Sequence, residues 1–444
     1  MMQWPPFFVR LLSQIVPGPT ARRCGSMRVH PAGCPTSLGW VAVGGETPAA
    51  ATPPGARASM VSPSPPTRPA TAGFQHRRAR TDDWRRPHRW LPLAVFLTTW
   101  FLIVPGQASS ECRAWKDFFS FDVVRDDARQ EWVWTSPTVQ AAAPFRELIL
   151  SWNMEFGWAG QARFEAGIVE EGAPVHFYEL GWWCAGPGEG ASRSVRGQKD
   201  ERGEVQTDTL VLRNPAKHYQ VRFRTSAATR QSARSPIRFL AVSLWNDAES
   251  AGPAREPGAS AHELQSVPRY CQLDHAGGSV WCSPTSVSMV LGHWAKTLGR
   301  PDLDVTVPFV AGEVFDPAWP GTGNWSFNVA FAGSFPKMRA YAARFSGLEE
   351  LWAWTSRGIP VPVSVCYNRL KQEPGPTSGH LVVCVGRAED GGVIVHDPGS
   401  RSMPRRVVSR EVFLRAWAHS NQTVYVVHPE GTEWPGPPGG AWLE

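Results

Sequence analysis

The sequence has little net charge once its first part is set aside, and that first part contains no lysine. Residues 1–90 hold 12 Arg, no Lys and three acidic residues, a balance of +9, against +6 for all 444 residues. The other 354 residues hold 33 basic and 36 acidic side chains, a balance of −3. A protein that binds nucleic acid is expected to carry a basic patch on its folded part. The charge distribution therefore argues against that class.

Residues with metal-ligand spacing are also absent. His275 and His293 lie near Cys282, but no further ligand at metal spacing completes a zinc site around them. We therefore expect no metal and no other cofactor. Glycine and proline together make up 82 of the 444 residues, which is too few for a wholly disordered chain. The chain must fold in part.

The segment 1–84 is expected to be disordered, because it contains 13 prolines and no sustained apolar periodicity. Three arginines follow, then the apolar run 91–104 and small residues at a cleavage position near Ala108. These features describe a secretory signal over 85–108, with an apolar run too short to span a membrane comfortably. We expect a secreted or extracytoplasmic protein, which is membrane-anchored if the signal is uncleaved.

A secretory signal belongs at a true N-terminus, so we expect translation to begin at Met60 or nearer Arg85. A long natural leader or a single-pass anchor is the alternative. Export permits disulfides, but their pairing cannot be read from the sequence. If one of the six cysteines after the signal is a catalytic thiol, at least one other stays unpaired. The six are Cys112, Cys184, Cys271, Cys282, Cys366 and Cys384.

Residues 111–248 show short β segments at near-regular spacing, with turn residues between them. This pattern favours an antiparallel sandwich. This region is dense in tryptophan, and we interpret these side chains as core, with exposed platforms for a cell-surface glycan or protein as the alternative. The tryptophans considered are Trp132, Trp134, Trp152, Trp158, Trp182 and Trp183. Residues 249–266 are rich in Ala, Gly, Pro, Glu and Ser and predict a linker. The expected strands are 147–155, 161–168, 176–183, 207–212, 218–225 and 237–245.

From residue 267 the pattern changes to mixed α and β. Residues 283–296 have apolar side chains at helical spacing, with Pro284 in the first turn and Gly299 just beyond the end, and they predict a helix. The run Asp390-Gly391-Gly392 predicts a hairpin turn. We also expect helices at 348–356 and 411–419, strands at 361–367, 380–386, 392–396 and 423–428, and a flexible tail over 431–444.

Cys282 lies at the start of the predicted helix, within the stretch CQLDHAGGSVWCSPTS of residues 271–286. Unpaired backbone N–H groups and the helix dipole favour an anion at such a position. The pKa of a thiol there is lowered, and the thiolate becomes a competent nucleophile. The alternatives are a buried structural thiol or a disulfide partner of Cys271.

A reactive thiolate needs a base, and the base needs an orienting group. His380 opens one strand of the predicted hairpin and Asp397 closes the other, so the turn brings them within a few residues of register. Gln272, ten residues before Cys282, can donate its side-chain amide to an oxyanion alongside the Cys282 N–H. A Cys/His/Asp site is therefore geometrically possible. The alternatives are a structural histidine and an aspartate that only forms the turn before Pro398.

These motifs resemble those of a known family. The stretch around Cys282 is similar to the nucleophile region of the C39-like family, stand-alone exported members of the papain-like cysteine peptidases. Residues 375–383, GPTSGHLVV, resemble its histidine motif, and residues 396–398, HDP, resemble its Asn/His-Asp-Pro motif. The similarity spans 267–430. Residues 145–153, FRELILSWN, resemble the N-terminal region often found with this domain in secreted bacterial members.

The resemblance implies a papain-like fold, and two departures limit what it implies about the substrate. The insertion at 276–279 lengthens the interval before the nucleophile. No P-loop signature follows, so cleavage of double-glycine leaders during transport is not implied. Residues 321–328 resemble a family loop that walls the substrate groove, with Asn324 and Trp325 as candidate groove residues and a plain turn as the alternative. The implied roles are Cys282 as nucleophile, His380 as base, Asp397 as orienting acid and Gln272 as oxyanion donor.

We therefore expect an α+β papain-like cysteine peptidase domain preceded by an antiparallel β-sandwich and a disordered leader. The predicted function is an exported cysteine hydrolase that cleaves peptide or amide bonds through a thioester, acting on a peptide or protein substrate. The alternatives are a cell-wall peptide amidase, a transpeptidase, or an inactive extracellular binding protein. The expected organisation is 1–84 disordered, 85–108 signal, 111–248 sandwich, 249–266 linker, 267–430 peptidase domain and 431–444 tail.

Overall fold

The computed structural model describes residues 110–155, 158, 160–184, 192–226, 235–246, 260–376, 379–435 and 441–443. All of them fall within one compact unit of the chain. The predicted disordered segment 1–84 and the predicted signal 85–108 lie outside the described residues. Within the described ranges, no helix is both long and apolar enough to cross a membrane.

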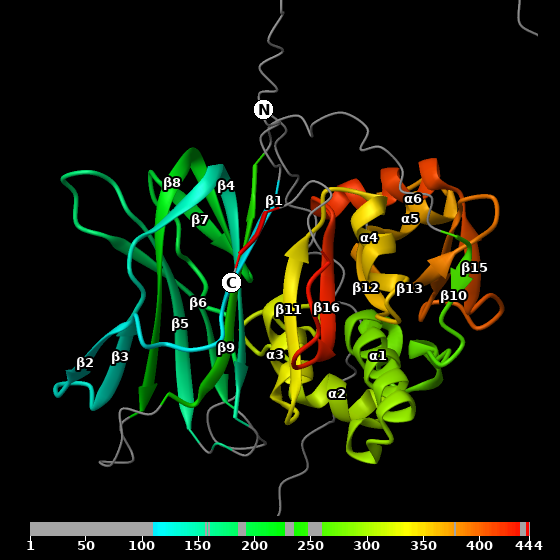
Figure 1. Ribbon diagram of the computed structural model, residues 1–444, viewed down its shortest axis with the longest axis horizontal. Helices are drawn as coiled ribbons and strands as arrows, with labels where there is room; N and C mark the ends of the chain where they lie inside the picture. Colours follow the sequence, from blue (N-terminus) through cyan, green and yellow to red (C-terminus); the bar gives the residue numbers. More distant parts are fainter. Residues whose placement is uncertain are drawn as a thin grey trace, which may run out of the picture. The chain divides into compact units, whose positions relative to one another are not determined.

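Antiparallel strands build the first half of the described chain (Figure 1). They form one sheet in the order β17-β1-β9-β4-β8-β3-β2, in which β5 and β7 also pair with β8, and β6 pairs with β5. The predicted antiparallel, sheet-rich N-terminal region is confirmed. Its strands are β1 (Ser110–Trp115), β2 (Asp122–Asp126), β3 (Glu131–Thr135), β4 (Val139–Met154), β5 (Gln161–Ile168), β6 (His176–Cys184), β7 (Gly203–Gln206), β8 (Thr209–Ser226), β9 (Ile237–Trp245) and β17 (Ala441–Leu443).

The expected strands 207–212 and 218–225 are a single long strand, β8. Its first part pairs with β4 and β7, and its second part pairs with β3 and β5, so the hydrogen bonding of the sheet is continuous. The strand continues past Pro215 because its pairing with β4 is irregular there, with register shifts on either side of Phe145. Proline is tolerated where the ladder lacks a hydrogen bond.

Tryptophan side chains fill the core of this β region. Trp134, Trp152 and Trp183 are buried, and the ring of Trp152 stacks on Phe164 with centroids 4.0 Å apart. The core interpretation is confirmed for these three residues. Burying large aromatic rings supplies much of the apolar area that stabilises a domain.

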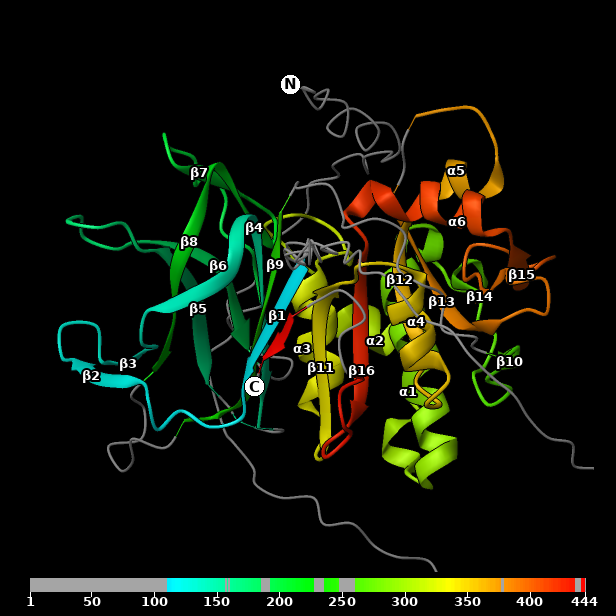
Figure 2. The ribbon, with the colours of Figure 1, turned by 45° about the horizontal axis from the view of Figure 1, so that its top comes forward.

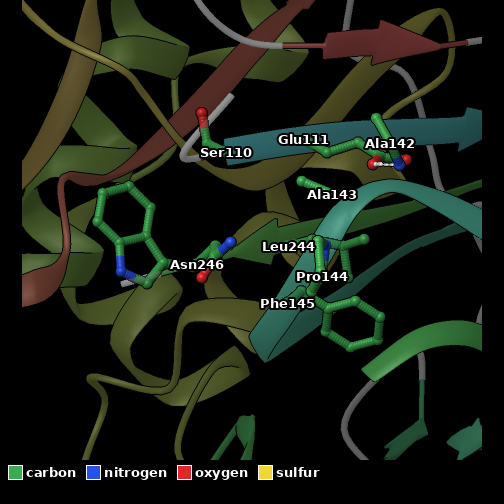
Figure 3. A pocket seen from close by; sticks show the side chains of 9 residues that line it. Ser110, Glu111, Ala142, Ala143, Pro144, Phe145, Leu244 and Asn246 are labelled. Atoms are coloured by element: carbon green, nitrogen blue, oxygen red, sulfur yellow. Dashed lines mark hydrogen bonds between the residues drawn. The ribbon is translucent and has the colours of Figure 1, made fainter. Parts of the chain in front are cut away.

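A small cavity lies beside β1, lined by Ser110, Glu111 and Ala142 among others (Figure 3). Its volume is about 10 Å³, roughly the space that one water molecule needs. The Glu111 carboxylate already accepts a hydrogen bond from the Ala142 N–H at 2.7 Å. The cavity is therefore too small to hold a substrate.

The second half of the described chain contains an antiparallel sheet in the order β11-β16-β12-β13-β14-β15, with β10 added to β13. Helix α1 packs on β12 and β13, and helices α5 and α6 pack on each other and on β12 (Figure 2). The expected α+β arrangement is confirmed. Its strands are β10 (His262–Glu263), β11 (Met338–Arg344), β12 (Val361–Cys366), β13 (Gly379–Arg387), β14 (Val393–His396), β15 (Arg405–Val408) and β16 (Thr423–Pro429). Its α-helices are α1 (Cys282–Leu298), α2 (Val307–Glu313), α3 (Trp325–Ser334), α4 (Leu348–Thr355), α5 (Tyr367–Lys371) and α6 (Arg410–Trp417).

Two predicted boundaries differ from the structure. The predicted linker 249–266 includes β10, which pairs with β13 at Arg387 and Gly386. The predicted tail 431–444 includes β17, which pairs in parallel with β1. Each short strand satisfies backbone N–H and C=O groups of a strand that would otherwise lack a partner on that side.

Helix α3 was not expected from the sequence. Every residue of α3 after Trp325 is buried, so the helix shows no apolar stripe beside a polar face. It packs between β4 of the N-terminal sheet and β11 of the C-terminal sheet. An all-round buried helix carries no amphipathic period by which the sequence could predict it.

The edge strand β11 is covered by side chains from the N-terminal sheet. Asn153 of β4 donates from Nδ2 to the Ala340 carbonyl at 2.7 Å and accepts from the Ala340 N–H at 3.0 Å. An uncovered edge would leave these buried groups unpaired. The same pattern continues at alternate residues, where the N–H groups of Ala342 and Arg344 donate to the hydroxyls of Ser151 and Ser243, both at 3.0 Å.

We predict that Asn153→Ala destabilises the protein by about 3 kcal/mol, because it leaves a buried N–H and a buried carbonyl of Ala340 without partners. Chemical denaturation of the purified chain measures this change. Gln140→Ala is the matched control, since Gln140 is exposed on the same strand, and it should change the free energy of unfolding by less than about 0.5 kcal/mol. Equal unfolding midpoints for the two variants would contradict the prediction.

Candidate active site

Cys282 is the first residue of α1, and it is partly exposed. The helix begins where the sequence predicts, and Gly299 ends it in a left-handed conformation at φ 64°. No side chain caps its N-terminus, so the Ser283 N–H in the first turn is available to stabilise an anion. The backbone N–H groups of Leu381 and Ser283 donate to the Cys282 sulfur. This position favours the thiolate form.

The β13–β14 hairpin brings His380 and Asp397 together. Its turn forms at the predicted Asp-Gly-Gly run, with Gly391 at φ 81°. The register pairs Val383 with His396, so one further step places Asp397 opposite Val382, two residues from His380. Residues two apart on a strand share a face, and diagonal neighbours across a pair of strands are within reach of each other.

His380 lies between the other two predicted residues. Its Nε2 is 2.9 Å from Asp397 Oδ1. The imidazole also interacts with the Cys282 thiol through a side-chain hydrogen bond. The exposed fraction is 5% for His380 and 0% for Asp397. The structure therefore brings the three residues together in the order Cys, His, Asp, with only the thiol partly open to solvent.

The charges of the three groups support one another. Burial opposes ionisation of the Cys282 thiol, but the hydrogen bond and charge of His380 outweigh it, and the pKa of Cys282 is lowered. Burial also opposes the charged imidazole, yet the hydrogen bonds to Asp397 and Cys282 raise the pKa of His380 to about 9. The pKa of Asp397 is lowered by His380 despite burial. The thiolate of Cys282 and the imidazolium of His380 therefore stabilise each other.

The turn after Asp397 is shaped by close packing. The Gly399 N–H donates to Asp397 Oδ1 at 2.9 Å. A Cβ atom at position 399 would lie 3.0 Å from His380 Cε1 and 2.9 Å from the Tyr367 hydroxyl. Glycine at this position therefore lets the backbone approach the imidazole ring closely.

Two residues that the sequence analysis did not single out contact the second oxygen of Asp397. The Tyr367 hydroxyl donates to Oδ2 at 3.1 Å, and Arg406 Nε lies 3.1 Å from the same atom. Tyr367 directly follows β12, and Arg406 belongs to β15. The pairing of β12 with β13 and of β14 with β15 would have pointed to both residues, but the sequence does not reveal which strands are neighbours.

Gln272 is buried in a short 3₁₀ turn before Cys282. Its Nε2 donates to the Ser279 carbonyl at 2.9 Å, and its backbone N–H donates to the Pro398 carbonyl at 2.9 Å. One amide hydrogen remains beyond the bond to Ser279. The insertion packs tightly, because a Cβ at Gly278 would lie 1.8 Å from the Gln272 carbonyl oxygen. Gln272 is thus held by both the Cys282 loop and the turn after Asp397.

The two candidate groove residues lie at the start of α3. Asn324 is fully buried, caps the helix by accepting the Phe327 N–H at 3.1 Å, and donates to Asp316 Oδ2 at 3.3 Å. This placement assigns Asn324 to helix capping and leaves it no surface to offer a substrate. Trp325 is partly exposed, and its N–H donates to the Asp208 carboxylate. A groove contact for Trp325 stays a prediction.

The described cysteines are free thiols, so Cys271 and Cys282 are not joined by a disulfide. His293 uses both ring nitrogens away from the thiol, at 2.7 Å from Ser266 Oγ and 3.0 Å from the Gly358 carbonyl. In the part of the chain that the structure describes, no group of three or more His, Cys, Asp or Glu is placed to hold a metal ion.

Comparisons with known families give the site its context. Residues 264–425 match the model of the Peptidase C39 like family. The predicted resemblance to the C39-like family is confirmed. Residues 124–244 match the model of the Peptidase C39 N-terminal domain. The C39-like domain, as we call residues 264–425, contains Cys282, His380 and Asp397, and the match supports a cysteine-peptidase type of hydrolase.

Among solved structures, the chain is similar to a candidate C39-like peptidase from Bacillus anthracis. The two are 19% identical, and the similarity covers 39% of this chain and 100% of the other, with a TM-score of 0.31. A comparison with curated proteins found no match.

We predict that iodoacetamide alkylates Cys282 of the native protein at pH 6, because only the thiolate reacts and its pKa is lowered. Loss of the imidazolium in His380→Ala should move the pH–rate profile of alkylation to higher pH. Peptide mass spectrometry of the alkylated chain measures both rates. Cys384 is the internal control, since burial raises its pKa to about 12, and it should stay unmodified. A Cys282 profile that does not change in His380→Ala would contradict the prediction.

Proposed function

We propose that the chain is an exported cysteine peptidase that cleaves peptide or amide bonds through a thioester intermediate. The observation that carries the proposal is His380, which contacts both the partly exposed Cys282 thiol and the buried Asp397 carboxylate. Nucleophile, base and orienting acid arranged in this way activate a thiol for attack on an acyl carbon. The match to the C39-like family supports the same class of reaction.

The proposed reaction follows from the charges of the pair. The Cys282 thiolate attacks the carbonyl carbon of the substrate, and His380 gives its proton to the leaving amine. The resulting thioester is attacked by water, which gives a proton to the now neutral His380 as it adds to the carbonyl. Breakdown of this adduct releases the carboxylic acid and restores the thiolate–imidazolium pair. Asp397 holds the ring orientation and stabilises the imidazolium.

The developing negative charge on the carbonyl oxygen needs donors. The backbone N–H of Cys282 at the start of α1 and the Nε2 of Gln272 are the proposed pair. Gln272 is suited to this role because its bonds to Ser279 and Pro398 fix it beside both catalytic loops. Donors that are already fixed in place stabilise the oxyanion without further reorganisation.

Cell-wall amidase action and transpeptidation would use the same thioester with a different substrate or acceptor. Mass spectrometry of the products distinguishes them. Hydrolysis by a peptidase or an amidase adds one water to the two products taken together, whereas transpeptidation joins the acyl half to a second amine. An amidase is then recognised by its cleavage of a cell-wall peptide. We propose the peptidase because the family match concerns peptidases.

We predict that E-64 labels the native protein on Cys282 only, since the epoxide reacts with an activated thiolate. Labelling should be absent in Cys282→Ala and at least tenfold slower in His380→Ala, because the neutral thiol is a poor nucleophile. Intact-mass and peptide mass spectrometry measure both.

Cys184→Ala is the matched control, because Cys184 is partly exposed and belongs to β6, outside the C39-like domain. This variant should label at the wild-type rate. A folded wild-type protein that E-64 leaves unlabelled, and that cleaves no member of a peptide library, would overturn the proposed function.

We predict that Gln272→Ala lowers kcat for peptide cleavage by about 10²–10³-fold, the typical cost of losing one oxyanion donor. Alkylation of Cys282 by iodoacetamide should stay near the wild-type rate, because that reaction develops no oxyanion. Steady-state kinetics and alkylation rates measured on the same preparation test the prediction. An unchanged kcat would show that Gln272 is not an oxyanion donor. Loss of Cys282 alkylation would show instead that Gln272 is needed for the folding of the Cys282 loop.

A further inference from the structure

We propose that Tyr367 and Arg406 are positioning residues that fix the Asp397 carboxylate and, through it, the His380 ring. The inference rests on the proposed function of Cys282 and His380. It extends that function by assigning roles to two residues outside the Cys/His/Asp set and the oxyanion donor.

The contacts around Asp397 divide between its two oxygens. Oδ1 accepts from His380 Nε2 and from the Gly399 N–H, both at 2.9 Å. Oδ2 accepts from the Tyr367 hydroxyl at 3.1 Å and forms an ion pair with Arg406 Nε at 3.1 Å. Each oxygen is therefore held from two directions. Rotation of the carboxylate, which would take Oδ1 away from His380, would break contacts on both sides.

Tyr367 also contacts the base directly. The ring centroids of Tyr367 and His380 are 4.0 Å apart, with 33° between their planes. The Lys371 ammonium lies 4.6 Å from the centroid of the Tyr367 ring. Tyr367 thus touches the acid with its hydroxyl and the base with its ring face. One side chain limits the movement of both groups.

The sheet explains how these groups meet. Cys366, the last residue of β12, pairs with Gly379, so Tyr367 continues beside the strand that carries His380. Arg406 on β15 pairs with Val395 of β14, two residues before Asp397. Tyr367, His380, Asp397 and Arg406 therefore come from or directly follow β12, β13, β14 and β15, which lie side by side in the sheet. Their contact is set by strand register, and no loop rearrangement is needed.

Arg406 has an electrostatic role as well. Asp397 is fully buried, and burial alone would favour its neutral form. The positive charges of His380 and Arg406 favour the carboxylate. The Arg406 charge does not depend on the protonation of His380, so it keeps Asp397 ionised during the steps in which the imidazole is neutral.

The first test is Tyr367→Phe, which removes the hydroxyl and keeps the ring on His380. We expect kcat to fall about tenfold with KM within twofold of wild type, since one hydrogen bond to a charged group is lost at a position that does not touch substrate. Tyr178→Phe is the matched control, because the Tyr178 hydroxyl is 2.7 Å from Asp200 Oδ1 in the N-terminal sheet. It should keep the wild-type kcat.

The second test is Arg406→Gln, read by its pH profile. Without the positive charge of Arg406, the pKa of Asp397 rises. When the pH is lowered, Asp397 is therefore protonated at a higher pH than in the wild type, and the imidazolium of His380 loses its negatively charged partner there. We expect the acid limb of both kcat/KM and Cys282 alkylation to move upward by about one pH unit. Arg406→Lys, which keeps the charge, should leave the acid limb close to its wild-type position. Arg300→Gln, which removes an exposed ion pair with Asp302, should leave the limb unchanged.

The alkylation profile separates failure of this inference from failure of the proposed function. A wild-type Cys282 with the alkylation profile of an ordinary thiol would overturn the proposed function. A wild-type profile shifted to low pH, together with wild-type kcat in Tyr367→Phe and an unmoved acid limb in Arg406→Gln, would overturn the positioning roles alone. Loss of folding in Arg406→Gln is detected by its unfolding midpoint, and the decision then rests on Tyr367→Phe.

Discussion

The register of β13 is the constraint on which the arrangement of the site depends. On one side β13 pairs with β12, which ends beside His380 and leads into Tyr367. On its other side it pairs with β14, which ends at Asp397, and α1 packs on it with Cys282 at its first residue. A shift of one residue in either pairing would turn His380 or Asp397 to the opposite face of the sheet. Strand pairing on both sides of β13 thus fixes the positions of His380 and Asp397, and the adjoining loops complete the site.

Burying the Asp397 carboxylate has a large desolvation cost that its partners must offset. The hydrogen bonds of His380, Gly399 and Tyr367 and the ion pair with Arg406 supply four contacts to two oxygens. Cys282, by contrast, is only partly exposed and has the N-terminus of a helix behind it. The buried end of the proposed triad therefore carries a stabilised charge, and its accessible end presents the proposed nucleophile. This gradient from buried acid to open thiol suits a nucleophile that must meet substrate.

Local patterns in the sequence were sufficient for the parts of the site that depend on short-range structure. The helix before Gly299, the Asp-Gly-Gly turn and the strands on either side of it predicted that Cys282, His380 and Asp397 could meet. Tyr367 and Arg406 were missed because their approach to Asp397 depends on the order of strands in the sheet. The groove role of Asn324 was implied only by the resemblance of residues 321–328 to a family loop, whereas the structure places Asn324 as the buried N-cap of α3. Helix α3 itself was missed because it is buried on all sides and has no amphipathic pattern. Where tertiary packing alone determines position, the sequence pattern carries no signal.

The contacts of β11 bear on what the N-terminal sheet does. A sheet edge must be paired, covered or charged, and β11 is covered at three alternate residues by Asn153, Ser151 and Ser243. Two of these three residues belong to the motif FRELILSWN, which predicts a strand and resembles the N-terminal region often found with the C39-like domain. Their side chains act as substitute strand partners for the sheet that carries His380 and Asp397. Because those bonds are buried, loss of the N-terminal sheet would expose a strand edge and its unpaired groups. The simplest physical role of the β region is therefore to complete the sheet of the C39-like domain.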